Sequence, residues 1–295
     1  MDPLHFLQII VLALVQGAAE LLPVSSSAHV ILAQKLMGMD PSDPKKVFLL
    51  VMLHTGTMFA VLVYFWPRWR RLLTAPADAA NESPRWHYLK MIVLATACTG
   101  FVGLGLKVFI EQIVLVHMMG YPKEEAKVEF LFKSLPTIAV ALGLVGVFIL
   151  LSGFREHKSQ DNRLTTRASI WIGLVQGLCL PFRGFSRSGA TISTGLVCGV
   201  SRSLAEDFSF ALAVVLTPPV QIYSLHKLLK DPSLTSATLM EALLPGLLGT
   251  IFSFVAGLFA LRFLSAVLEK GRWGYFGYYC LGFAAVVLAA HFLML

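Results

Sequence analysis

The chain has 295 residues, of which 56% are hydrophobic and only 14% are charged, and its mean hydropathy is +0.72. A soluble domain carries about 25% charged residues, so this composition excludes a soluble globular protein and indicates an integral membrane protein. Long apolar runs predict helices rather than a barrel, because each backbone polar group in lipid needs an internal partner. The net charge of +7 does not indicate nucleic-acid binding, since the basic residues lie in short loops between apolar segments.

The N-terminus and the cysteines carry two further expectations. The chain starts with Met1-Asp2-Pro3, without a basic region or a small-residue cleavage site, so we expect no removable signal peptide. The four cysteines all lie in apolar stretches and form no CxxC pair. A disulfide framework or a zinc site is therefore not expected.

In chain order, the first predicted element is Pro3–Gly38, which is too long for one membrane-spanning helix of about 20 residues. It is interrupted by Pro23 and a run of serines, so we expect two short helices that meet at a turn. Three uninterrupted spans follow, at Val47–Trp66, Tyr88–Leu106 and Ser134–Ser152. A second interrupted stretch then covers Ala168–Val200, with Pro181 and a Gly/Ser cluster in its middle. Three more spans complete the chain, at Phe208–Lys227, Ala242–Leu264 and Tyr275–Leu293.

Charged residues in the loops predict the orientation of these spans. The loop Arg68–Lys90 and the loop Arg155–Arg167 are both rich in basic residues, as cytoplasmic loops are. Lys107–Lys133 is balanced in sign, which is typical of an outside loop. Further basic residues lie on the cytoplasmic side near the C-terminus: Arg262, Lys270 and Arg272.

A tetrapeptide repeat divides the chain into two halves. Leu-Val-Gln-Gly occurs at positions 14–17 and again at 174–177, each time just before a polar break. Membrane proteins with inverted repeats build sites from such broken helices at the bilayer midplane. We expect one membrane domain, 1–295, with repeat one at about 1–153 and repeat two at about 168–295. Each half would be one re-entrant hairpin plus about three spans, and this odd number inverts the second copy. Two full spans per interrupted stretch remain the alternative.

The first break offers a carboxylate and a candidate metal ligand set. Glu20 lies deep in an apolar segment, and Gln16 precedes it by four residues, on the same helix face. An ionised carboxylate within the bilayer is costly, which makes Glu20 a functional candidate. A carboxylate satisfied by backbone groups or an arginine is the structural alternative. The oxygens of Glu20 and Gln16 suit a hard divalent ion, Mg²⁺ or Ca²⁺.

Three serines and a histidine follow this carboxylate. Ser25, Ser26 and Ser27 come directly after Pro23, where a second helix should start, and a serine there would cap it. Capping is the expected role for two of the three. His29 lies about one turn further on, and serine plus histidine suits a nucleophile with its base.

The second break supplies a cation. An arginine and exposed amides at a helix start form a phosphate cradle, and the apolar flanks argue against an arginine that merely extends to the interface. Arg183 is either a second cation or an interface anchor. In contrast, His54 lies among small polar residues of a span, where helix packing is the expected role and contact with the site is the alternative. The candidate phosphate-binding residues of the break are Ser186, Arg187, Ser188, Gly189 and Thr191.

Together these groups predict phosphoryl transfer on a phosphate attached to a membrane component. A metal and an arginine would neutralise the charge on the transferring group. A transporter of a phosphate-bearing lipid or small anion is the rival interpretation, because inverted repeats with helix starts at the midplane suit alternating access equally well.

Two motifs resemble one known family. The string QGAAELLPVSSSAH, at 16–29, resembles the (E/Q)xxxE…PVSSxxH motif of the bacterial undecaprenyl-pyrophosphate phosphatase, or bacitracin-resistance, family. RGFSRSGAT, at 183–191, resembles its PGxSRSxxT motif, and AEDFSF, at 205–210, resembles the stretch that follows. Gln16 stands where many members have Glu, which puts metal ligation by this residue in doubt. Arg183-Gly184 replaces Pro-Gly, so the turn geometry is expected to differ.

The resemblance implies an all-helical enzyme of the bacterial inner membrane with inverted repeats and a divalent metal. It would hydrolyse an isoprenyl pyrophosphate lipid at the outer face, recycle the carrier for peptidoglycan synthesis and counteract bacitracin. Glu20 would hold the metal with Gln16, Ser26 would attack the terminal phosphorus, and His29 would manage the proton. Ser25 and Ser27 would join Arg187 in binding phosphate. Attack by a metal-activated water in place of Ser26 is the alternative. The oligomeric state is open, with a homodimer as one possibility.

Overall fold

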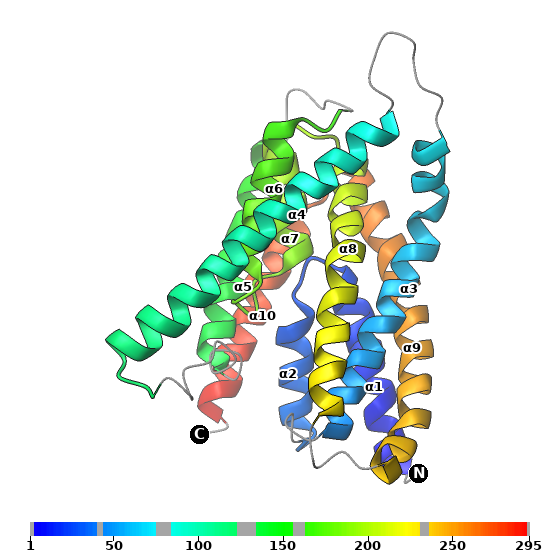
Figure 1. Cartoon of the computed structure of the whole chain (residues 1–295), viewed down its shortest axis with the longest axis vertical. Helices are drawn as coiled ribbons and strands as arrows, with labels where there is room; N and C mark the ends of the chain where they lie inside the picture. The colour runs from blue at the N-terminus through cyan, green and yellow to red at the C-terminus, as the bar shows by residue number, and fades with distance from the viewer. Residues whose placement is uncertain are drawn as a thin grey trace.

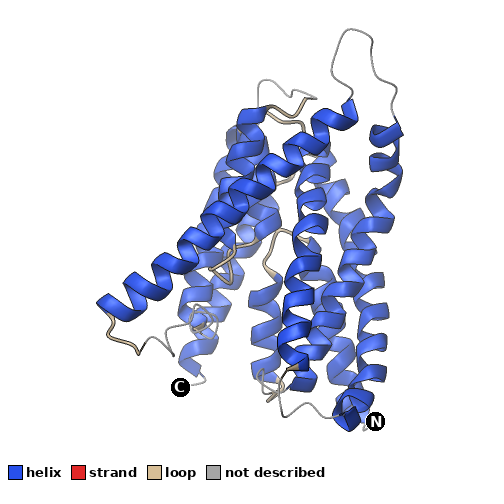
Figure 2. Ribbon diagram, viewed as in Figure 1, coloured by secondary structure: helices blue, strands red, loops and turns tan. Residues whose placement is uncertain are grey.

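Six long apolar helices dominate the molecule (Figure 1). The computed structural model describes residues 3–39, 44–74, 84–122, 134–155, 163–230 and 236–293, and over these residues it is helical without strands (Figure 2). All six predicted spans are confirmed as helices long enough to cross a membrane. They are α3 (Pro44–Thr74), α4 (Pro84–Val108), α5 (Leu135–Arg155), α8 (Arg202–Leu229), α9 (Ser236–Glu269) and α10 (Gly274–Leu293).

Each of the two interrupted stretches forms a pair of short helices, as predicted. The first pair breaks at residues 22–25 and the second at residues 180–186. Proline lacks the N–H that an interior helical residue donates, so Pro23 and Pro181 both favour a stop there. The four short helices are α1 (Pro3–Leu21), α2 (Ser26–Leu36), α6 (Thr166–Cys179) and α7 (Arg187–Val197).

The segment Lys107–Lys133 differs from the expected loop. The helix continues beyond α4 as η1 (Phe109–Met118), where the chain widens so that Met119 N donates to Val114 O over 3.0 Å. This part of the segment is strongly apolar, so it extends the helix instead of ending it. The predicted loop therefore begins only after Met118, and residues 123–133 lie outside the described residues.

Glycines allow the short helices to pack closely against long ones. Helix α9 packs along α1 and α3, while α6 packs along α4. A Cβ at Gly17 of α1 would lie 2.6 Å from the Ser253 carbonyl oxygen of α9, and one at Gly177 of α6 would lie 2.9 Å from the Thr99 carbonyl oxygen of α4. Small residues at such crossings let the two backbones approach, which stabilises helix pairs in lipid.

A partly buried ionic cluster joins three long helices near the end of α3 and the start of α8. These helix ends lie opposite both termini (Figure 1). Arg68 of α3 donates to Asp207 over 2.9 Å and to Glu206 over 3.3 Å, both on α8. Ser265 of α9 donates to the other oxygen of Glu206 over 2.6 Å, and Tyr64 donates to Ser265 over 2.9 Å. The cluster holds this end of α3, α8 and α9 together.

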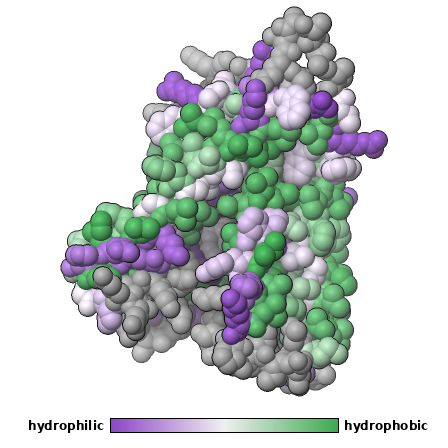
Figure 3. All heavy atoms as spheres, in the orientation of Figure 1, coloured by the Kyte–Doolittle hydropathy of each residue, from purple (hydrophilic) through white to green (hydrophobic). Residues whose placement is uncertain are grey.

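Apolar side chains cover much of the visible surface, and polar ones gather at its upper end and in smaller groups at the lower left and lower centre (Figure 3). Phe101 and Leu104 of α4 are 80% and 68% exposed, which would be unfavourable in water. An apolar surface around six long helices identifies a multi-pass membrane protein.

We expect Gly173→Ala to lower the thermal stability of the protein in detergent. A Cβ there would overlap the backbone of Ala95 in α4, which a side-chain rotation does not relieve. Overpacking of this kind costs about 1–3 kcal/mol. Gly105→Ala in α4 is the control, because nothing lies within 4 Å of its Cβ position. Equal melting temperatures for the two variants, measured by thermal unfolding, would contradict the close approach of α6 to α4.

Candidate functional site

The two helix breaks touch each other inside the bundle. Gly184 N, in the second break, donates to Ser27 Oγ at the start of α2 over 3.2 Å. Ser188 Oγ of α7 donates to the Leu22 carbonyl oxygen in the first break over 3.2 Å. The structure therefore brings together two segments that lie more than 150 residues apart in the sequence.

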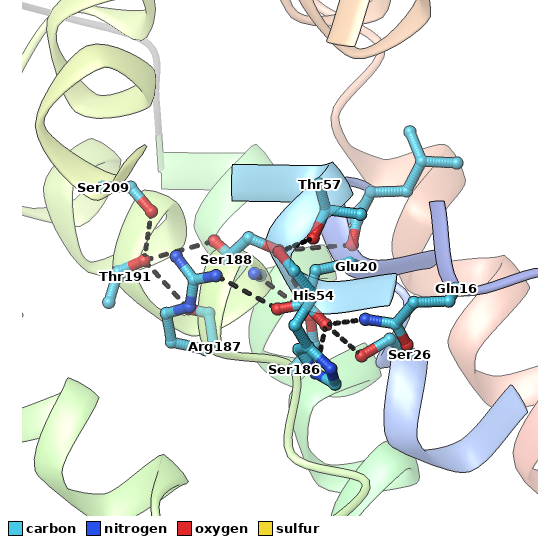
Figure 4. A network of polar contacts seen from close by, with 12 residues as sticks. Gln16, Glu20, Ser26, His54, Thr57, Ser186, Arg187, Ser188, Thr191 and Ser209 are labelled. Carbon is cyan, nitrogen blue, oxygen red and sulfur yellow. Dashed lines mark hydrogen bonds and ion pairs between the residues drawn. The ribbon is translucent and has the colours of Figure 1, made fainter. Parts of the chain in front are cut away.

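Glu20 is the centre of the polar contacts between the breaks (Figure 4). Its Oε2 accepts hydrogen bonds from Gln16 Nε2 at 3.1 Å and from Ser26 Oγ at 2.5 Å. Its Oε1 lies 3.4 Å from Arg187 Nη2 of α7. The carboxylate is thus bound to both helices of its own hairpin and to the opposite one.

Arg187 begins α7 and points at Glu20 (Figure 4). Ser186 caps this helix by accepting a hydrogen bond from Gly189 N over 3.3 Å. The second guanidinium nitrogen, Arg187 Nη1, is buried and has no hydrogen-bond partner among the described residues. A buried charged donor without a partner is unfavourable, so this nitrogen is a ready site for an anionic oxygen.

Both breaks line one cavity of about 270 Å³. Glu20 and Arg187 also line a smaller space between α3 and α8. The two charges therefore lie in the same pocket and are close enough to contact one ligand. Among the residues around the larger cavity are Glu20, Ser25, Ser26, Ser27, Arg183, Ser186, Arg187 and Ser188.

The serine cap expected at the start of α2 does not form. Ser25 precedes α2 with a φ of 66° and makes no side-chain cap, whereas Ser186, expected only as a phosphate-binding residue, caps α7. A capping residue normally has an extended backbone, which Ser25 lacks. Its hydroxyl instead lies 3.2 Å from that of Ser27. The first amides of α2 therefore receive no cap from Ser25.

His29 does not pair with Ser26, in contrast to the expectation from the sequence. Its Nδ1 lies 2.8 Å from the Ser25 carbonyl oxygen and its Nε2 lies 2.8 Å from the hydroxyl of Tyr279 in α10. The ring lines a different, apolar cavity of about 620 Å³. Ser26 donates to Glu20 instead, so Glu20 occupies the place that His29 was expected to take.

Thr191 and Gly189 support the helix start and do not line the cavity. Thr191 donates to the Arg187 carbonyl oxygen over 2.8 Å and lies 2.6 Å from Ser209 of α8, fully buried. Gly189 contributes its amide to the cap by Ser186. Both residues hold α7 in place behind Arg187.

His54 of α3 lies at the site, which the sequence interpretation had given only as the alternative to helix packing. Its Nε2 lies 3.7 Å from Glu20 Oε2, and it lines the cavity together with Glu20 and Arg187. The helix packing that was expected for this segment is made by Gly56. A Cβ at Gly56 would overlap α9, so α3 and α9 are in close contact at this residue. The signal that pointed to the site was an ionisable side chain within an apolar span.

The donor set around Glu20 suits only a metal that takes most of its ligands from elsewhere. Within the described part of the chain, no three side chains of His, Cys, Asp or Glu converge. One carboxylate and the Ser26 hydroxyl remain. The Gln16 amide faces Glu20 with its NH2 group, so its oxygen would bind an ion there only with the amide turned over. Mg²⁺ is commonly bound by one or two carboxylates plus substrate phosphates, so these residues fit such an ion when a phosphate is present.

Fold and site together define a multi-pass helical membrane protein that pairs a carboxylate with a guanidinium at two facing helix breaks. A family model described as "Bacitracin resistance protein BacA" matches residues 9–286, and the chain belongs to this family.

Several relatives match along most of their length. The chain is 52% identical over 292 residues to "Undecaprenyl-diphosphatase 2" of Acinetobacter baylyi, and the match covers 98% of each chain. It is 32% identical to "Undecaprenyl-diphosphatase 2" of Burkholderia thailandensis, with 92% of each chain covered. It is 31% identical to "Undecaprenyl-diphosphatase" of Desulfatibacillum aliphaticivorans, with 98% of this chain and 100% of the relative covered.

Proposed function

We propose that this protein hydrolyses undecaprenyl pyrophosphate to undecaprenyl phosphate and inorganic phosphate. This reaction recycles the carrier lipid for cell-wall synthesis and confers resistance to bacitracin. The family match over residues 9–286 and the relative that is 52% identical support it. The observation that carries the proposal is that Glu20 and Arg187 lie 3.4 Å apart in one cavity of a membrane protein.

Substrate binding is assigned to the second break. Arg187 presents a buried, unpaired Nη1, and the start of α7 directs its positive end at the same space. The uncapped start of α2 faces it from the first break. His54, Ser25 and Ser27 line the cavity and complete the set of groups around the phosphates.

Ser26 is the proposed nucleophile, with Glu20 as its base. The 2.5 Å hydrogen bond aims the serine proton at Glu20 Oε2. Attack forms a bond from Ser26 Oγ to the terminal phosphorus and breaks the anhydride bond, so undecaprenyl phosphate leaves and the proton stays on Glu20. Water then attacks the phosphoserine phosphorus and the bond to Ser26 Oγ breaks. Glu20 returns its proton to that oxygen, and inorganic phosphate is released. Because His29 faces Tyr279 and not Ser26, we assign Glu20 as the base in place of His29.

A divalent metal is also part of the proposal. Glu20 and Ser26 would hold it together with substrate oxygens, and Gln16 would join them once its amide turns its oxygen toward the ion. When bound, such an ion neutralises charge on the transferring phosphoryl group. Arg187 supplies the same kind of stabilisation from the opposite hairpin.

We infer an inverted repeat within a single membrane domain from the short helices and their packing. Helices α2, α6 and α7 have 11, 14 and 11 residues, fewer than the roughly 20 that a span needs, which favours re-entrant hairpins. Gly17 packs on Ser253 and Ala256 of α9, and its counterpart Gly177 packs on α4 in the same manner. Corresponding glycines thus meet different long helices, as two copies of one motif would.

The orientation of the protein in the membrane follows from its basic loops and from the helix ends near them. The ionic cluster of Arg68, Glu206 and Asp207 closes the end near the basic loop that the positive-inside rule assigns to the cytoplasm. We infer an inner-membrane enzyme whose cavity faces the periplasm. A lipid or anion transporter is not favoured, because transport has no use for a hydroxyl aligned on a carboxylate.

We expect purified protein in detergent to release inorganic phosphate from undecaprenyl pyrophosphate. Glu20→Gln and Arg187→Ala should each lower kcat/KM by about 100- to 1000-fold, because each removes a preorganised charge from the site. Lys107→Ala is the control, since Lys107 is half exposed and its ion pair is with Glu111. Micelles have no second compartment, so phosphate release there is catalysis and not transport. Lipid movement across the bilayer of reconstituted vesicles without phosphate release would favour the transporter.

A phosphoserine at position 26 is the second expectation. Substrate labelled in its terminal phosphate, quenched with acid during turnover, should label wild-type protein at Ser26. Ser26→Ala should carry no label and lose about 1000-fold or more in kcat. If Ser26→Ala keeps most of its rate and wild type carries no label, a water molecule attacks directly.

Metal binding should depend on phosphate and on Glu20. We expect Mg²⁺ to raise the melting temperature of EDTA-treated protein strongly only when inorganic pyrophosphate is also present, because the protein alone offers one carboxylate. Glu20→Gln should abolish this joint shift. An equal shift in Glu20→Gln would exclude this residue as the ligand.

A further inference from the structure

Ser25 has an unusual backbone conformation at the first break. It is the one non-glycine residue with positive φ in the described part of the chain, at 66°. Side chains other than glycine rarely adopt this region, and such residues persist at functional sites only when their surroundings hold them there. Ser26, the proposed nucleophile, follows directly, so whatever fixes Ser25 also sets the direction of Ser26.

His29 supplies the short contact to this strained residue. Its Nδ1 lies 2.8 Å from the Ser25 carbonyl oxygen, whereas its own backbone N lies 3.5 Å from the same oxygen. The regular helical hydrogen bond at the start of α2 is therefore long. The imidazole takes its place as the close partner of the Ser25 carbonyl.

Helix α10 in turn fixes the imidazole. The hydroxyl of Tyr279 lies 2.8 Å from Nε2, and the ring of Phe283 stacks on His29 with centroids 3.8 Å apart and planes 3° apart. A carbonyl oxygen only accepts, so Nδ1 donates to Ser25. In the neutral ring Nε2 then accepts from Tyr279. Both nitrogens are engaged away from the Ser26 hydroxyl, which donates to Glu20.

We propose that His29 is a positioning residue, which holds the Ser25 carbonyl and thereby aims Ser26, and that Tyr279 and Phe283 of α10 hold His29 in turn. This inference rests on the proposed function and adds two residues of the last helix to the machinery. The catalytic proton goes to Glu20, and the imidazole keeps its proton on Nδ1 throughout. A loss of 1 Å in the alignment of a nucleophile can cost about 100-fold in rate, which is why such a support matters.

Two substitutions of His29 separate positioning from proton transfer. Asn places an N–H donor where Nδ1 lies, so His29→Asn keeps the bond to Ser25. Gln places its polar end where Nε2 lies, so His29→Gln loses that bond while it still reaches toward Tyr279. Both variants lose the stacked ring, so their melting temperatures in detergent should fall by similar amounts.

The measurement is phosphate release from undecaprenyl pyrophosphate by the full chain in detergent. We expect kcat of His29→Asn to stay within about tenfold of wild type, whereas His29→Gln and His29→Ala fall by about 100-fold or more with little change in KM. If His29→Asn is as inactive as His29→Ala while it remains folded, the positioning role is wrong and the imidazole itself takes part in proton transfer.

Tyr279→Phe tests the support from α10 without disturbing its packing, since the ring stays and only the hydroxyl is lost. We expect a fall in kcat of several-fold to tenfold at unchanged KM and nearly unchanged melting temperature. Unchanged kcat in Tyr279→Phe would exclude Tyr279 from the proposal. A wild-type protein that releases no phosphate would contradict the proposed function itself, a result distinct from either of these.

Discussion

A carboxylate and a guanidinium inside a membrane protein depend on each other. Placing either charge alone at the centre of a bilayer costs about 3 kcal/mol or more. Glu20 and Arg187 come from different hairpins and lie 3.4 Å apart. Each therefore requires the other hairpin to be in place. The contacts from Gly184 to Ser27 and from Ser188 to Leu22 hold the two breaks in the arrangement that this pairing requires.

The same pairing leaves capacity for a ligand. Glu20 engages one guanidinium nitrogen of Arg187, and the other is buried without a partner. A pyrophosphate that occupies this second position brings negative charge next to the Glu20 carboxylate, which is unfavourable. Transfer of the Ser26 proton neutralises Glu20 as the phosphoryl group moves, and a bound cation would act in the same direction. The Glu20 carboxylate thus has two roles: it accepts the Ser26 proton and it pairs with Arg187.

The breaks and the pairing of Glu20 with Arg187 could be predicted because their causes are local: a proline stops a helix, and a charge in an apolar segment needs a partner. The groups that His29 and His54 contact could not be predicted in this way. His29 and His54 give the same signal, a titratable group in apolar sequence. Their roles depend on distant neighbours, since Tyr279 lies 250 residues from His29. Serine capping failed likewise, because the sequence does not reveal the positive φ at Ser25.

The two hairpins share a motif but differ in how their second helix begins. Ser186 caps α7 in the ordinary way, and this leaves Arg187 on a regular first turn. Ser25 does not cap α2 with its side chain, and its own backbone is strained. The side chain of His29, one turn further along α2, holds the Ser25 carbonyl oxygen. A relaxed helix start suffices to bind an anion. A nucleophile must be aimed, and the strained turn with its support from α10 is what distinguishes the first hairpin from the second.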